Sequence, residues 1–108
     1  MTLAEFRALV ASLPETMDRV HCRGLKGTLP RAVWQEARIE QVYASNQACV
    51  EKTTIALEYI TKDEEDPGVQ AIKDMFRSVK MPFVCEVLYD EDKDEISYMF
   101  NVWLEEDL

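Results

Sequence analysis

The chain has no long hydrophobic run, which excludes a membrane-spanning helix. No apolar stretch in it approaches the about 20 residues that cross the hydrocarbon core of a bilayer. The first residues, MTLAEFRALVASL, also lack the basic start and continuous apolar block of a secretory signal peptide. We therefore expect a protein that is made and kept in a cytoplasm and has no membrane partner.

Basic residues are scarce in this chain. It has 12 lysines and arginines against 21 aspartates and glutamates, for a formal net charge of −9. Proteins that bind the backbone of nucleic acids need clusters of basic side chains that displace its counterions. As a whole this chain would repel DNA, so the composition argues against a nucleic-acid-binding protein.

Cysteine and glycine are also few. Cys22, Cys49 and Cys85 make an odd count at wide spacing, which is neither a disulfide framework nor a zinc-binding pattern. We expect reduced, mostly buried thiols. The three glycines fit no phosphate-binding loop, and nothing in the sequence indicates a cofactor.

The composition that remains is that of one folded domain, residues 1–108, with 47% apolar and 31% charged residues. Its most strongly patterned stretch is Cys49–Thr61, which contains no glycine or proline. In an extended strand, Ile55, Leu57 and Tyr59 fall on one face. A strand this apolar needs sheet neighbours and a covering helix, so we expect the fold to be organised around it.

Two helices are predicted from their starting signals. Thr2 and Glu5 have the spacing of a capping box, and apolar residues then recur at helical spacing, which predicts a helix over residues 2–13. Asp66 and Pro67 are a typical N-cap and first helical residue, and they predict a second helix that ends near Val79.

The strands are predicted from alternation and from turn signals. Residues 20–22 could form a short strand. A strand is expected from Ala32 to about Arg38, and the apolar residues of Ile39–Tyr43 could extend it. The alternating runs Phe83–Tyr89 and Ile96–Leu104, joined by a charged loop, predict a hairpin. The sequence thus predicts an α+β domain: an antiparallel sheet of four to five strands with two helices packed on one face, in the order α-β-β-(β)-α-β-β.

The charged loop has part of the pattern of a calcium site. Residues 90–94 place acids at the first, third and fifth positions, as a calcium-binding hand does. However, Glu95 stands where that motif needs glycine, and Asn101 stands where it needs a bidentate acid. A solvated hairpin tip is the better interpretation, and we predict no metal site.

Candidate catalytic groups are weak. His21 and Cys22 are neighbours in a predicted strand, so their side chains point to opposite faces and do not form a nucleophilic pair. Pairing of His21 with another cysteine across the fold stays open. Five glutamates are scattered along the predicted strands, and the sequence places no two of them together: Glu36, Glu40, Glu51, Glu58 and Glu86. We predict no enzyme activity.

Trp103 and Met99 alternate with the core-facing residues of the last strand. They would lie on the outer face of the sheet, where a large aromatic residue favours a protein–protein contact. The alternative is that a helix covers that face. Charge is also uneven: residues 1–38 hold six bases against four acids, whereas residues 90–108 hold eight acids and one base. The two ends could favour head-to-tail contacts, or both could simply be solvated surface.

The order of these segments resembles that of a known family. They are an N-terminal amphipathic helix, the strand start Leu29–Trp34, the link Val42–Asn46, the strand Val50–Thr61, a helix from Pro67 and a terminal hairpin. Together they resemble the small tail-completion, or tail-terminator, proteins of long-tailed bacteriophages and related prophage tail modules. The resemblance runs from Thr2 to about Glu105, and residues 15–27 depart from it most.

This resemblance implies a role in virion assembly. Such proteins form a ring, commonly a hexamer, on the last ring of the tail tube, stop its polymerisation and present a surface to the head connector. The partners would be the chain itself, the tail-tube protein and a head-connector protein, and DNA would pass without specific binding. The protein would act in the host cytoplasm during assembly and stay in the virion tail. The candidate interface residues are Arg31, Arg38, Met99, Trp103, Asp90, Asp92, Asp94, Glu95 and Glu105, with the arginines of one subunit paired with the acids of the next.

Other functions fit parts of the same pattern. A small acidic inhibitor, such as an immunity or DNA-mimic protein, would use the net charge and the acidic hairpin tip to bind a basic partner. A head-side completion adaptor uses a similar small fold. An enzyme would need a cleft that brings His21 or a cysteine beside one of the strand acids.

Overall fold

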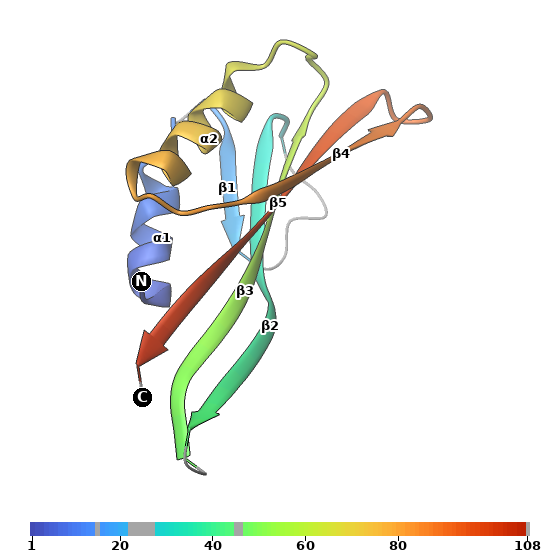
Figure 1. The fold of residues 1–108 in the computed structure, drawn as a ribbon. Coiled ribbons are helices and arrows are strands. Elements are labelled where there is room, and N and C mark those ends of the chain that lie inside the picture. The colour runs from blue at the N-terminus through green and yellow to red at the C-terminus, as the bar shows by residue number, and fades with distance from the viewer. Residues whose placement is uncertain (15, 22–27, 45–46, 108) are drawn as a thin grey trace.

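A computed structural model describes residues 1–14, 16–21, 28–44 and 47–107. It contains two helices and one five-stranded sheet with strand order β1-β2-β3-β5-β4 (Figure 1). The elements are α1 (Leu3–Ala11), β1 (Asp18–His21), β2 (Arg31–Ala44), β3 (Gln47–Thr61), α2 (Pro67–Ser78), β4 (Val84–Asp90) and β5 (Glu95–Asp107). The predicted α+β class and element order are confirmed, and the predicted organising strand is the middle strand of the sheet. No helix in the described part of the chain is long and apolar enough to cross a membrane.

The sheet is mixed, so the prediction of a wholly antiparallel sheet is wrong. β1 pairs in parallel with the first four residues of β2, whereas all other neighbours are antiparallel. A four-residue strand has too short a pattern to indicate its direction. The alternation of side chains predicts which face a residue occupies but not which way a neighbouring strand runs.

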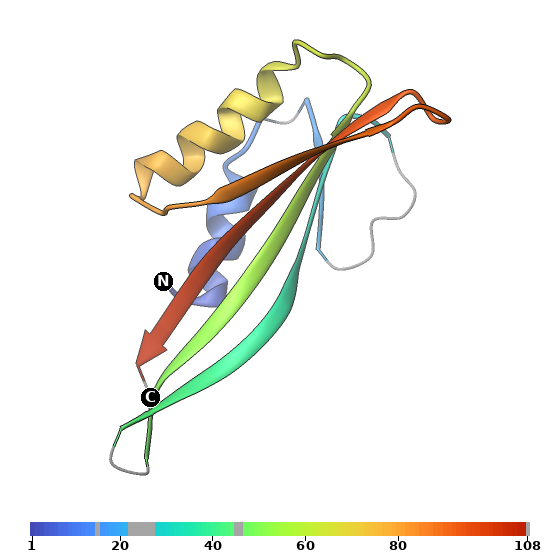
Figure 2. The same cartoon turned by 45° about the vertical axis from the view of Figure 1, so that its right-hand side comes forward.

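Both helices pack on the same face of the sheet, as predicted (Figure 2). We call this the helix-covered face and the opposite one the bare face. The core between helices and sheet is aromatic: Phe6 of α1 lies edge-on to Trp34 of β2, with ring centroids 5.1 Å apart. Phe76 of α2 contacts Phe6 at 6.5 Å and Phe100 of β5 at 5.9 Å. These rings join both helices to two strands, β2 and β5.

The N-terminal ends of both helices are capped as the sequence predicts. Thr2 and Glu5 form a capping box at the start of α1. The Leu3 amide donates to a Glu106 carboxylate oxygen 3.2 Å away, which places a negative charge at the positive end of the helix dipole. In α2, Asp66 accepts from the Gly68 amide at 2.7 Å and from the Thr61 hydroxyl at 2.6 Å. The cap therefore also ties α2 to the end of β3.

The strand expected to reach at least Arg38 is longer in the structure, since β2 continues through Ala44. This lengthens the hairpin of β2 and β3. β1 pairs with β2 only as far as Trp34, and β4 pairs with β5 only from Val84 to Asp90. The far end of the sheet is consequently three strands wide, and the molecule is elongated, 51 × 27 × 21 Å. Three apolar side chains of this far end are exposed: Ile39, Val42 and Tyr43.

The cysteines do not follow one pattern. Cys49 and Cys85 are free thiols, and Cys85 is half-buried. Cys49 is exposed, so the prediction of a buried thiol is wrong there: it lies in the far part of the hairpin, beyond the helices. Cys22 and the predicted loop at residues 24–27 lie outside the described residues, as do Ser45 and Asn46 of the predicted turn.

Candidate functional site

The bare face carries the predicted aromatic residue. β5 alternates between the core residues Phe100, Val102 and Leu104 and the side chains that point the other way, which include Met99 and Trp103. Trp103 is 38% exposed and Met99 is half-buried. Because α1 and α2 both lie on the opposite face, the alternative in which a helix covers Trp103 is wrong.

Charged side chains surround this tryptophan. Trp103 is directly opposite Thr54 of β3, which is opposite Arg38 of β2. The next row of the same face places Glu105 opposite Lys52 and Lys52 opposite Glu40. The Arg38 Nε atom and a Glu40 carboxylate oxygen are 2.7 Å apart at an exposed position. Arg38, Trp103 and Glu105 therefore form one surface of a large aromatic ring with charges of both signs, which suits a protein contact.

Arg31 lies apart from this surface. It is the first residue of β2, opposite Ile60, and only 7% of it is exposed. A guanidinium buried to this degree is not presented to a neighbouring subunit. Of the two arginines predicted to pair with acids of another copy, Arg38 alone has an exposed side chain, at 70%.

The acidic residues form two separate groups. Asp90, Asp92, Asp94 and Glu95 belong to the tip of the β4–β5 hairpin, which is confirmed as a hairpin. Glu105 lies near the other end of β5, about 33 Å away at 3.3 Å per residue. At the tip, Asp90 Oδ1 accepts from the Asp92 amide at 3.1 Å and from the Lys93 amide at 3.2 Å, so this carboxylate shapes the turn. One arginine of a neighbour cannot contact both acidic groups.

The single histidine has a defined partner. His21 of β1 stacks on Trp34, with ring centroids 3.9 Å apart, and its Nε2 atom lies 3.1 Å from both carboxylate oxygens of Glu36. Sequence reasoning missed this pair, because it depends on β1 lying beside β2. Burial alone would raise the pKa of Glu36, but hydrogen bonds from its own backbone amide and from His21 outweigh burial and lower that pKa. A lowered pKa keeps Glu36 ionised, whereas a general acid needs a raised one.

These hydrogen-bonded carboxylates predict an acid-sensitive fold. Burial alone would also raise the pKa of Asp66, but hydrogen bonds from the Thr61 hydroxyl and the Gly68 amide outweigh it and lower that pKa. The ordinary pKa values are 4.5 for Glu36 and 3.8 for Asp66. The stabilisation is therefore complete at neutral pH and is lost as the pH falls below these values through the lowered ones.

We expect the urea concentration at the midpoint of unfolding to decrease as the pH is lowered from 7 to about 3. The double variant Glu36→Gln, Asp66→Asn should have a lower urea midpoint than the parent chain at pH 7, and its midpoint should decrease less on acidification. Glu64→Gln, at an exposed position, is the matched control and should behave like the parent chain. Parallel pH profiles for parent and double variant would contradict this assignment.

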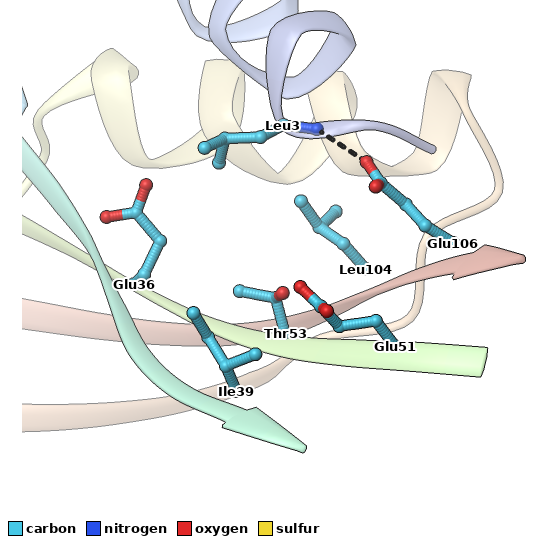
Figure 3. A pocket seen from close by; sticks show the side chains of 7 residues that line it. All are labelled: Leu3, Glu36, Ile39, Glu51, Thr53, Leu104 and Glu106. Carbon is cyan, nitrogen blue, oxygen red and sulfur yellow. Dashed lines mark hydrogen bonds between the residues drawn. The ribbon is translucent and has the colours of Figure 1, made fainter. Parts of the chain in front are cut away.

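A shallow cavity of about 190 Å³ opens on the helix-covered face, where α1 begins at Leu3 above the sheet (Figure 3). It is lined by Leu3, Glu36, Ile39, Glu51, Thr53, Leu104 and Glu106. The register of β2 and β3 thus brings Glu36 and Glu51, scattered in the sequence, to one cavity. The Glu106 carboxylate is held by the Leu3 amide and that of Glu36 by His21. Within the described ranges, no three or more His, Cys, Asp or Glu side chains are grouped to hold a metal ion.

No protein-family model and no curated protein matches this chain.

Proposed function

We propose that this chain is a tail-completion protein of a long-tailed bacteriophage or a related prophage tail module. It caps the tail tube as a ring-shaped oligomer, stops tube polymerisation and supplies the surface that joins tail to head. The observation that carries the proposal is the bare face of the sheet, with exposed Trp103 between charges of both signs, in a domain whose elements follow the order that the resemblance implies.

The charge of the chain supports passage of DNA through such a ring. A ring of six copies has a formal charge of roughly −54, six times the −9 of one chain. A strongly acidic channel repels the phosphate backbone, so DNA slides through without binding. The protein then works in the virion tail and, during assembly, in the host cytoplasm.

A ring also needs a head-to-tail contact that closes. The proposal assigns Arg38 of one subunit to this contact, because its side chain is exposed on the same surface as Trp103. Its partner in the next subunit is the acidic hairpin tip of residues 90–95 or the group at Glu105. Arg31 is left out of the contact because it is buried.

The test is tube length. The chain is mixed with the assembling tail-tube protein encoded in the same genome, and tubes are measured by negative-stain electron microscopy. We expect short tubes with a ring at one end. Trp103→Ala should require about thirtyfold more protein for the same shortening, since a central tryptophan in an interface contributes about 2 kcal/mol or more. Val79→Ala, which alters a residue of nearly equal exposure (39% against 38%) at the end of α2, is the matched control.

Unchanged tube lengths with the parent chain would contradict the proposal. A Trp103→Ala variant as active as the parent, or a control as weak as Trp103→Ala, would exclude the bare face as the surface involved.

A second function is favoured by one observation, the exposed acids at the hairpin tip. An acidic inhibitor or DNA-mimic protein would bind a basic enzyme there, one to one, and would leave tail tubes unchanged. A head-side completion adaptor would also leave tube length unchanged but would be found on filled heads.

A further inference from the structure

The outer edge of β4 is the most apolar open edge of the sheet. β4 is the last strand in the strand order, and no described residue pairs with its outer side. Four of its seven residues are large apolar side chains with high exposure: Val84 at 50%, Val87 at 43%, Leu88 at 58% and Tyr89 at 70%. Val87 and Tyr89 point to the helix-covered face, and Val84 and Leu88 point to the bare face. A strand that is apolar on both faces is typical of a sheet interior rather than of an edge.

Natural proteins usually protect an edge strand with lysine, proline, a bulge or short length. The other open edge of this sheet has such protection: β2 beyond Trp34 carries two register shifts and the charged residues Glu36, Arg38 and Glu40. β4 contains no lysine, proline or bulge; its charges are Glu86 and, at its end, Asp90, and its pairing with β5 is regular from end to end. Of the two open edges, the β4 edge is therefore the better suited to pair with another strand.

We propose that β4 pairs antiparallel with β4 of a second copy of this chain, joining two sheets into one across a two-fold axis at Val87. The contact is self-complementary, as a two-fold interface must be. It is a property of the free protein and does not rest on the proposed function.

The charges within β4 select one register. Pairing about Val87 uses all seven residues and places Glu86 opposite Leu88 and Asp90 opposite Val84 of the other copy. The two neighbouring registers that keep the faces aligned pair five residues each. One of them places Glu86 opposite Glu86 of the other copy, and the other places Glu86 opposite Asp90 of the other copy. Like charges directly opposite each other destabilise a sheet, so the pairing about Val87 is favoured both by length and by charge.

The flanks of β4 support the choice of a second copy as partner. Arg77 and Lys80 precede β4, whereas the acidic hairpin tip of residues 90–95 follows it. Antiparallel pairing puts the flank that precedes one β4 beside the flank that follows the other. The basic flank of each copy therefore meets the acidic flank of its partner, twice in each dimer. Interfaces this small are weak, so we expect dimers that form as the concentration is raised.

The first test is the mass of the free protein by sedimentation equilibrium, at concentrations up to about 1 mM to reach weak affinities. The parent chain should rise from the monomer mass of 12.5 kDa towards twice that value. Val87→Lys places two lysines opposite each other at the axis and should stay monomeric, with an unchanged circular dichroism spectrum. Val42→Lys is the matched control, because Val42 is a valine of similar exposure (51%) on β2, and this variant should dimerise like the parent.

The second test reads the register. Opposed residues of antiparallel strands have Cα atoms about 4.5–5.5 Å apart, within the range of a disulfide. Val87→Cys should therefore form a covalent dimer on mild oxidation. Val84→Cys should not, because position 84 of one copy lies six residues, about 20 Å, from position 84 of the other. The parent chain, which has Cys85 in β4, gives the background level of covalent dimer.

A parent chain that stays monomeric up to the highest concentration would overturn the proposal. So would an oligomer that Val87→Lys leaves intact, or equal loss of the dimer in Val87→Lys and Val42→Lys. Stronger crosslinking through position 84 than through position 87 would overturn the register.

Discussion

Replacing Gly68 with alanine is expected to destabilise the fold by about 3 kcal/mol, the upper part of the range for overpacked cores. Gly68 is buried in the first turn of α2, directly against the ring of Tyr59. A Cβ atom at this position would lie 2.1 Å from the Tyr59 hydroxyl oxygen and 2.5 Å from the ring carbon that bears it. Tyr59 is fully buried in the middle strand, so its ring cannot move aside. The loss far exceeds the helix propensity that alanine adds.

The measurement is urea unfolding of Gly68→Ala beside Pro67→Ala, an exposed neighbour in the same turn. Adding Tyr59→Phe removes the closer of the two contacts but leaves the ring carbon, so it should recover only part of the loss. A Gly68→Ala variant as stable as the parent chain would show that α2 does not lie against Tyr59 as described.

Replacing Phe76 with alanine is expected to cost about 3–5 kcal/mol, a large share of the stability of a domain of this size. Phe76 is fully buried, and its ring lies 5.9 Å from that of Phe100, 6.5 Å from that of Phe6 and 5.7 Å from that of Phe83. Its removal takes away a ring that contacts α1, β5 and the segment before β4 together, and it leaves a cavity between them.

Tyr43→Ala provides the comparison, because Tyr43 is 63% exposed in the far part of the hairpin. Its free energy of unfolding should change by no more than about 0.5 kcal/mol. If Phe76→Ala lowered stability as little as Tyr43→Ala does, the packing of α2 on the sheet would have to be revised.

Much of the fold could be predicted because single patterns decide it. The capping box fixes where α1 begins, Asp66 and Pro67 fix where α2 begins, and the alternation in β5 fixes which side chains face the helices. The direction of β1 could not be predicted, since four residues carry no information on pairing. Nor could the close contact of Gly68 with Tyr59, which depends on how α2 lies across the sheet.

The candidate site was predictable in part for the same reason. Alternation alone places Trp103 and Met99 on the face opposite the core, and the structure confirms that position. It does not predict that Arg31 is buried while Arg38 is exposed. The exposure of β4 was also beyond the pattern: Val87 and Tyr89 occupy the helix-covered face, yet 43% and 70% of their surfaces are exposed. The extent of a helix over a sheet is a property of the packing, not of the strand.

The most direct test of the tail-completion proposal is the length of tails made without this protein. Its gene is inactivated in the genome that encodes it, and particles are measured by electron microscopy, with a restored copy of the gene as the control. The proposal predicts tubes longer than normal tails and filled heads that carry no tail, both corrected by the restored copy. Tails of normal length joined to filled heads would contradict it.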